Sequence, residues 1–110
     1  DFIKAMAMGA DAIAVSNAAM QAIGCLAMRA CHTNNCPVGI ATQMPHLVNR
    51  LVAEKSAQQL ANFFEASVGL LQVMARACGH AHLSKFERDD LPTWKKDLAA
   101  VSGVTFGGVA

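Results

Sequence analysis

The sequence has few charged residues, and residues of like charge do not cluster along it. Asp, Glu, Lys and Arg make up 15% of the 110 residues, and the formal net charge is +1. In typical soluble domains about 25% of the residues are charged. The sequence has no cluster of lysine and arginine, so it lacks the electrostatic footprint of a nucleic-acid-binding protein. We therefore expect no nucleic-acid partner.

The sequence also lacks a clear membrane span or export signal. The apolar stretch at residues 12–28 contains Ser16, Asn17 and Gln21 and is shorter than the ~20 apolar residues of a transmembrane helix. No basic region followed by an apolar core opens the chain, as it would in a signal peptide. We therefore expect no membrane partner and a cytoplasmic location. There the four cysteines are more often metal-binding or catalytic than disulfide-bonded.

Several common catalytic signatures are missing as well. The sequence contains neither a Walker phosphate loop nor a G-x-G-x-x-G turn, and it shows no Ser/His/Asp triad or paired-carboxylate pattern. The charged run at residues 87–90 is interpreted as a solvated surface. His80 and His82 are interpreted as surface residues near a helix end, where positive charge is favourable, rather than as metal ligands.

Apolar residues, in contrast, are abundant. They make up 54% of the chain before glycine is counted, against roughly 45–50% with glycine included in ordinary domains. A domain of this length buries less than three-quarters of the surface of its unfolded chain. We therefore expect the chain to be a piece of something larger or to pack against partners.

The N-terminal third has the rhythm of an α/β protein. Residues 1–9 indicate the end of a helix that stops at Gly9. The uninterrupted apolar run Ala12–Val15 is typical of a strand buried on both faces. Helical spacing resumes at Ala18, which completes a helix–strand–helix order. Because a parallel strand needs hydrogen-bonded neighbours, we expect the missing strands to precede Asp1.

Helices are expected to dominate the remainder of the chain. Pro45 suits the first turn of a helix, an apolar stripe continues along residues 60–78, and Gly79 is a plausible stop. An unbroken helix over residues 46–78 would be about 50 Å long, so it should either break near Gly69 or lie along a larger body. Short amphipathic helices are expected at residues 84–91 and 93–101, followed by an extended glycine-rich tail at 102–110.

Three cysteines form the strongest chemical pattern. Cys25, Cys31 and Cys36 follow the spacing C-x5-C-x4-C, and Pro37 comes directly after the third. Thiolates on one short loop can converge on a soft metal centre such as an iron–sulfur cluster with little loop-closure entropy. Three ligands suit a three-iron cluster. Two alternatives remain open: buried or partly oxidised cysteines, and a Cys3His zinc site completed by His32, although zinc sites usually show closer cysteine spacing.

A second candidate site lies at the strand-to-helix turn. Ser16, Asn17 and Ala18 follow the expected strand and begin the next helix. Free backbone N–H groups and the helix dipole at such a position favour a phosphate group. The alternative is that Ser16 and Asn17 simply cap the helix.

These residues resemble the glutamate synthase FMN-binding domain family, at the end of its (β/α)8 barrel. The cysteine-containing string is the most specific part of the resemblance, which covers nearly all of the chain. The segments that carry it are GADA at 9–12, IGC at 23–25, CHTNNCPVGIATQ at 31–43, KSA at 55–57, VMARACG at 73–79 and LSKF at 83–86.

The resemblance implies a fold and two cofactors. The fold would be α/β: residues 1–42 would form the last βα unit of the TIM barrel with the cysteine loop, and residues 43–110 a helical C-terminal extension. FMN would be held through its phosphate by backbone groups at Ser16, Asn17 and Ala18, where many members carry Gly-Thr or Gly-Ser instead. Cys25, Cys31 and Cys36 would ligate a [3Fe-4S] cluster.

The resemblance also implies an activity. Electrons would pass from the cluster to FMN, which would reduce 2-iminoglutarate, formed from 2-oxoglutarate and ammonia, to L-glutamate. The implied partners are 2-oxoglutarate, glutamine or ammonia as substrates, and an electron-donor protein or reductase subunit. The fragment alone would be inactive. Two alternatives stay open: a flavin barrel acting on another substrate, and a non-enzymatic zinc-bearing helical module that docks on a partner.

Overall fold

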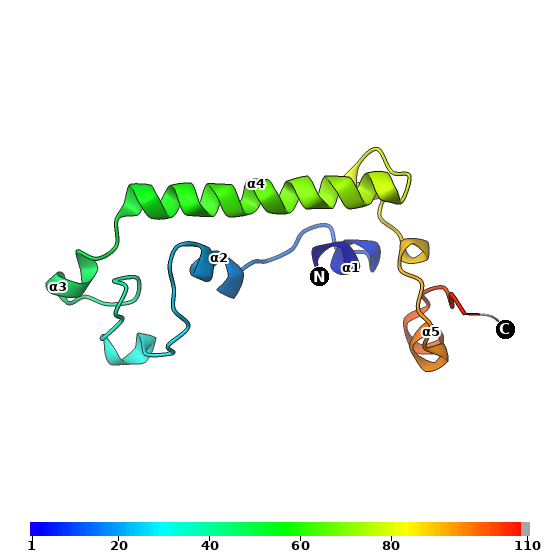
Figure 1. Cartoon of the computed structure of the whole chain (residues 1–110). Helices are drawn as coiled ribbons and strands as arrows, with labels where there is room; N and C mark the ends of the chain where they lie inside the picture. The colour runs from blue at the N-terminus through cyan, green and yellow to red at the C-terminus, as the bar shows by residue number, and fades with distance from the viewer. Residues whose placement is uncertain (109–110) are drawn as a thin grey trace. The chain divides into compact units, whose positions relative to one another are not determined.

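The computed structural model describes residues 1–108, and this part of the chain is helical (Figure 1). By contact, residues 15–67 form one compact unit, and residues 1–14 with those from Val68 onward form another. Helix α4 begins in the first unit and ends in the second. The helices are α1 (Phe2–Ala7), α2 (Asn17–Ala22), η1 (Cys31–Thr33), α3 (Pro45–Val48), α4 (Ala53–Ala77), η2 (Leu83–Lys85), η3 (Arg88–Asp90) and α5 (Lys96–Ser102).

The expected strand at Ala12–Val15 is wrong for the chain as it stands. These residues have no regular secondary structure, and no strand occurs anywhere in residues 1–108. The only β-type pairing described there is an isolated parallel bridge between Thr93 and Phe106. A parallel strand must exchange hydrogen bonds with a neighbour, and these residues contain no second strand to provide one.

Three helix boundaries lie where glycine and proline residues predicted them. Helix α1 is followed by Gly9 with φ of 104°, and α4 is followed by Gly79 with φ of 81°. Glycine takes this left-handed conformation without the steric penalty of a Cβ atom. Pro45 occupies the first turn of α3, where a missing N–H leaves no intrahelical bond unmade. These three helix boundaries are confirmed.

The expected break near Gly69 is wrong. Helix α4 continues through Gly69 to Ala77, and the interruption lies instead at residues 49–52, between α3 and α4. One glycine inside a helix costs only about 1 kcal/mol relative to alanine. The surrounding residues of α4 are mostly good helix formers, so their summed propensity outweighs that cost.

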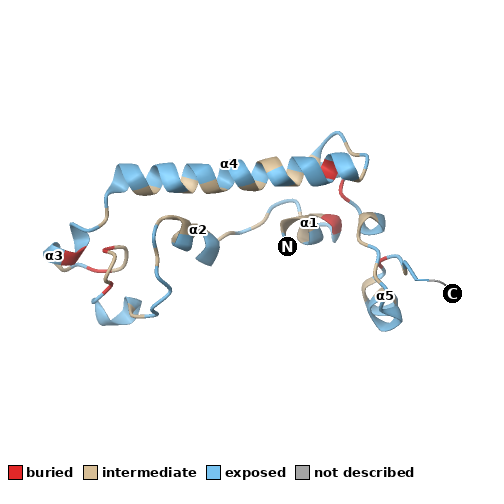
Figure 2. Cartoon of the chain, viewed as in Figure 1, coloured by how far each residue is buried: buried red, intermediate tan, exposed pale blue. Residues whose placement is uncertain are grey.

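A small apolar core holds the unit built from residues 1–14 and the C-terminal half of the chain. Ala7 of α1, Ala75 of α4 and Phe86 between η2 and η3 are buried (Figure 2). The segments therefore meet through side chains that are distant in sequence. The partly buried residues packed against these three are Ile3, Met6, Cys78, Leu83 and Leu91.

The other unit is held by hydrogen bonds to loop carbonyls. The Ser56 hydroxyl of α4 donates to the Ile23 carbonyl at 3.3 Å, after the end of α2. The Arg50 guanidinium donates to the Pro37 carbonyl at 2.9 Å. The two bonds tie the irregular segment at residues 23–44 to the residues around α3 and the start of α4.

The C-terminal segment is less helical than the pattern predicted. Two 3-10 turns, η2 and η3, replace the helix expected at residues 84–91, whereas α5 falls within the helix expected at 93–101 except for its last residue. Thr93 donates its N–H to the Thr105 carbonyl at 2.9 Å and accepts from Gly107 at 2.8 Å. The tail is therefore paired along part of its length. Residues 109–110 of the expected extended tail lie outside the described residues.

Much of the apolar excess lies on the surface. Val101, Trp94 and Leu70 are 89%, 80% and 68% exposed, and no large side chain in residues 1–108 is completely buried. This agrees with the expectation that the chain carries more apolar surface than it can cover. Among the described helices, none combines the length and the apolar character needed to cross a bilayer.

Replacing Gly69 with alanine is expected to stabilise α4. An added Cβ atom would meet no heavy atom within 4 Å, and the substitution should gain about 0.5–1 kcal/mol of local stability. Hydrogen exchange of the α4 amides in the full-length protein would measure the gain. Gly79→Ala is the matched control and should have the opposite sign, because its φ is positive. Faster exchange in Gly69→Ala would contradict the uninterrupted helix.

Candidate functional site

The three cysteines of the C-x5-C-x4-C pattern line one cavity. Cys25, Cys31 and Cys36 surround a space of about 20 Å³ together with Leu26, Met28, Arg29, Ala30, Pro37 and Val38. All three are free thiols. The structure therefore brings together the residues that the spacing singled out, although they lie up to eleven positions apart in an irregular loop. His32 is exposed and does not line this cavity.

Cys36 has the most organised surroundings of the three. It is 7% exposed. Hydrogen bonds from the backbone N–H of Ala41, then Val38, lower the pKa of the Cys36 thiol, with smaller contributions from Ile40 and Gly39 and an opposing effect of burial. Donors aimed at sulfur favour the thiolate, which is the form that binds metals.

Cys25 and Cys31 are held more loosely. The Cys25 sulfur accepts the Ala27 N–H at 3.4 Å, and Cys31 is exposed at the start of η1. Between them, Ala27 and Arg29 have positive φ angles of 56° and 55°. Non-glycine residues adopt this conformation uncommonly, and it is found at sites where function constrains the backbone.

A hydrogen-bonded pair, Asn34 and Thr42, closes the cysteine loop. No sequence pattern predicted this pair. Asn34 is in the left-handed conformation and Thr42 is buried. The Thr42 hydroxyl donates to the Asn34 carbonyl at 2.5 Å. Both residues stand in the string that carried the family resemblance, but no periodicity links two polar residues eight positions apart.

The three thiols are chemically suited to a soft metal centre, but their positions in the structure are not yet those of a metal site. Three free thiols on one short loop, one of them accepting a backbone N–H, are of the kind that ligates iron–sulfur clusters. Within residues 1–108, however, no three His, Cys, Asp or Glu side chains converge closely enough to hold a metal ion. The cavity is just larger than the space one water needs. The loop would have to widen to admit a cluster.

Ser16, Asn17 and Ala18 lie at the start of α2, as expected. Ser16 is the N-cap and its side chain makes no capping bond. All three residues are exposed. Because the first N–H groups of a helix have no intrahelical acceptor, the backbone at this turn can donate to an anionic group. They lie in the same compact unit as the cysteine loop.

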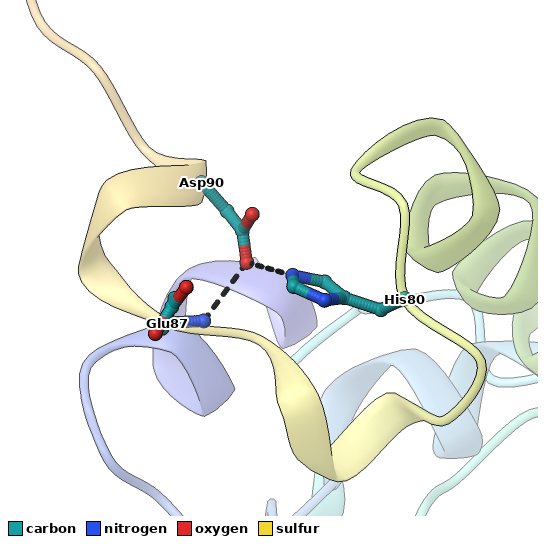
Figure 3. Close-up of polar contacts among 3 residues, drawn as sticks. All are labelled: His80, Glu87 and Asp90. Carbon is teal, nitrogen blue, oxygen red and sulfur yellow. Dashed lines mark hydrogen bonds and ion pairs between the residues drawn. The ribbon is translucent and has the colours of Figure 1, made fainter.

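In the other unit the interpretation of residues 87–90 as a solvated surface holds for Glu87, Arg88 and Asp89, which are exposed, and is wrong for Asp90, whose carboxylate is largely covered. Asp90 accepts a hydrogen bond from the Glu87 N–H at 2.9 Å and pairs with the His80 ring at 2.7 Å (Figure 3). The Asp90 and His80 side chains are only 11% and 17% exposed. Asp90 and His80 therefore form an internal pair, because η3 turns the carboxylate back toward the segment after α4.

The pKa values of Asp90 and of the neighbouring Cys78 thiol are both shifted. The Glu87 N–H, and then His80 and Cys78, lower the pKa of Asp90 against the effect of burial. Burial, followed by the negative charge of Asp90, raises the pKa of Cys78. Cys78 packs against the apolar core, as expected of a small buried residue. A thiol with a raised pKa is a poor nucleophile and a poor ligand.

Comparison with known proteins places most of the chain in one family. Residues 1–81 match the family model described as "Conserved region in glutamate synthase". No solved structure gives a significant match.

Three relatives illustrate the similarity. A "Glutamate synthase large subunit-like protein" of Rhizobium meliloti is 34% identical over all of this chain and 28% of its own length. An "Archaeal glutamate synthase [NADPH]" of Methanocaldococcus jannaschii is 43% identical over 72% of this chain and 16% of its own. A "Ferredoxin-dependent glutamate synthase" of Antithamnion sp. is 48% identical over 58% of this chain and 4% of its own. The chain thus spans under a third of each relative.

Removing the Asp90 carboxylate is expected to loosen residues 80–90 in a pH-dependent manner. A carboxyl whose pKa is lowered on folding stabilises the fold above the ordinary aspartate value of about 3.9, and this contribution disappears as the pH falls through the lowered pKa. Asp90→Ala should therefore speed hydrogen exchange of these amides at pH 6, and the difference from wild type should shrink below pH 4. Asp11→Ala, an exposed carboxylate of the same unit, is the control. A difference independent of pH would contradict a stabilising role for the ionised Asp90 carboxylate.

Proposed function

Since the chain belongs to the glutamate synthase family, we propose that it carries the metal-binding loop of a glutamate synthase-type oxidoreductase and the phosphate end of its flavin site. The observation that carries this proposal is that Cys25, Cys31 and Cys36 line one cavity. The family assignment concerns the sequence, whereas the gathering of the three free thiols is a feature of the fold.

In the proposed metal centre each cysteine has a separate part. Cys36 would be the anchoring ligand, because it is buried and already surrounded by backbone donors. Cys31 is exposed and would close onto the metal last. Cys25 would approach from the end of α2. The three ligands suit a [3Fe-4S] cluster, the type that the resemblance implies.

The proposed flavin contact lies at the other end of the same short helix. The backbone N–H groups of Ser16, Asn17 and Ala18 would donate to the FMN phosphate, assisted by the dipole of α2. Helix α2 has six residues and is therefore about 9 Å long. Because Cys25 follows this helix closely, the phosphate and the nearest sulfur would lie within one short structural unit.

The proposed fold of the full-length protein explains the unpaired segment Ala12–Val15. Residues 1–42 would form the last βα unit of a (β/α)8 barrel, with Ala12–Val15 paired to strands outside the present chain, and residues 43–110 a helical extension. In such barrels a phosphate is frequently bound after strands 7 and 8, at the N-terminus of an extra helix. The exposed apolar side chains agree with packing against such a body.

The proposed reaction is the reductive amination of 2-oxoglutarate to L-glutamate with ammonia derived from glutamine. When bound, the cluster would supply electrons and FMN would supply hydride to the imine of 2-oxoglutarate. An electron-donor protein or reductase subunit is the proposed partner, and the relatives differ in the donor that their names give. The proposed location is the cytoplasm, where cysteines more often bind metals or act in catalysis than form disulfides.

A substrate assay separates this proposal from its main alternative within the enzymes. The full-length protein should form glutamate from 2-oxoglutarate when glutamine or ammonia and a reductant are supplied. A flavin barrel with another substrate would retain FMN and iron but leave 2-oxoglutarate unchanged. That result would contradict the proposed substrate without contradicting the proposed cofactors.

Replacing Cys31 with serine in the full-length protein is expected to remove the cluster. A serine hydroxyl is a much poorer ligand for iron than a thiolate, so iron, acid-labile sulfide and the broad visible absorption should all fall. Cys78→Ala is the matched control, because Cys78 lies in the core of the other unit, and it should keep its iron. Unchanged iron and sulfide in Cys31→Ser would contradict the ligand assignment, and a colourless wild-type protein containing zinc would favour the zinc module.

Replacing Ala18 with aspartate is expected to weaken FMN retention. The new carboxylate would repel the phosphate, whereas an acidic residue in the first helical turn stabilises α2 itself. Loss of flavin could therefore not be ascribed to loss of the helix. Gln21→Glu, near the other end of α2, is the control. Fluorescence of flavin released from the purified protein gives the stoichiometry, and equal retention in Ala18→Asp would contradict phosphate binding at this turn.

A further inference from the structure

We propose that a cleft beside the cysteine loop binds a small organic anion, whose carboxylate or phosphate head is held by the Arg50 guanidinium and the Lys55 ammonium. The inference assumes neither a metal nor a flavin. The cleft is also separate from the turn at Ser16, Asn17 and Ala18, since none of these three residues lines it.

The cleft lies within the unit of residues 15–67 and has a volume of about 280 Å³. Four segments line it: the residues after α2, the cysteine loop, the link between α3 and α4, and the first turns of α4. Ile23, Val38, Leu51 and Val52 provide apolar lining. The volume is slightly below the roughly 300 Å³ at which small-molecule pockets commonly begin. The cleft therefore suits an anion with a short apolar body rather than a nucleotide.

Arg50 and Lys55 give the cleft a positive charge that no acidic residue offsets. Neither Asp nor Glu lines it. Both ion pairs found in residues 1–108 join residues of the other unit. Arg50 and Lys55 are exposed, so a ligand can reach them. Because like charges on one cleft repel each other, an anion bound there offsets that repulsion.

The Arg50 side chain is positioned at the cleft by a hydrogen bond. Its Nη1 donates to the Pro37 carbonyl at 2.9 Å, which occupies one of the five N–H donors of a guanidinium group. The remaining donors belong to a planar group that matches the geometry of carboxylates and phosphates. Lys55 and Gln59 both line the cleft from α4, one turn apart on the same side of the helix. Their side chains add further N–H donors.

The walls of the cleft are tied together before any ligand binds. The Ser56 hydroxyl donates to the Ile23 carbonyl at 3.3 Å and so joins α4 to the residues after α2. Gly39 has φ of 80°, and a Cβ atom there would come within 3.1 Å of the Leu51 nitrogen and 3.2 Å of the Val48 carbonyl oxygen. The cysteine loop therefore lies directly against the end of α3 and the residues that follow it. A site that is already formed loses less entropy on binding.

The cleft shares part of its lining with the cavity of the three cysteines. Pro37 and Val38 line both, and Pro37 directly follows Cys36. A ligand packed against these two residues would restrict the segment that carries Cys36. Hydrogen exchange should therefore slow on both sides of the cleft, at residues 38–41 and at residues 50–56, when the ligand is added.

The test titrates the full-length protein with inorganic phosphate and with succinate and follows binding by calorimetry. We expect Lys55→Gln to weaken binding of the preferred probe about tenfold, which is the effect of losing one hydrogen bond to a charged group. Glutamine and lysine have similar helix propensities, so α4 should stay intact. Lys85→Gln is the matched control, because it removes the same charge from an exposed residue of the other unit, and it should leave the affinity unchanged.

The preferred probe identifies the head of the ligand: tighter binding of phosphate indicates a phosphate head, and tighter binding of succinate indicates a carboxylate. Unchanged affinity in Lys55→Gln would place the anion at another site, such as the turn at Ser16, and would overturn the proposal. Equal weakening in Lys55→Gln and Lys85→Gln would overturn it as well, since only net charge would then matter. Failure of the wild-type protein to bind either probe would also overturn it. Iron and flavin contents test the proposed function separately, because Lys55→Gln should leave both unchanged.

Discussion

The hydrogen bond from the Thr42 hydroxyl to the Asn34 carbonyl closes the cysteine loop, and most of the order in that loop depends on this bond. A loop of this composition has no regular secondary structure to satisfy its N–H groups, and buried N–H groups must find an acceptor. Asn34 Oδ1 accepts the Gln43 N–H, and the Thr42 hydroxyl oxygen accepts the Met44 N–H. The Asn34–Thr42 pair and the contact of Gly39 with α3 then determine where the loop lies relative to the helix. The arrangement of Cys25 and Cys31 is looser in comparison.

Local residues made part of this structure predictable. Gly9, Pro45 and Gly79 mark helix boundaries because each has a conformational requirement of its own, which operates whatever surrounds it. The cysteine spacing predicted a shared site because short loops bring their ends together at small entropic cost. The phosphate turn at Ser16 remains a prediction, as do both cofactors.

Other features depend on partners that a local pattern does not reveal. Ala12–Val15 has the composition of a buried strand, but a strand exists only where a neighbour accepts its hydrogen bonds. The pairing of His80 with Asp90 joins residues ten positions apart across two irregular turns, so no helical or strand period marks it. The predicted helix break near Gly69 was wrong for a local reason. The helix-breaking tendency of one glycine is weak, and the long run of helix formers around it outweighs that tendency.

The core of the unit that contains α1 has an evolutionary consequence. The match to the family's conserved region ends at residue 81, whereas Phe86, Leu83 and Leu91 complete that core and Asp90 is hydrogen-bonded to the His80 ring. The region that the family model covers therefore ends inside a packed unit. A gene fusion or truncation made after residue 81 would expose Ala7 and Ala75, so residues 82–91 must be inherited together with the conserved region for this part of the protein to stay folded.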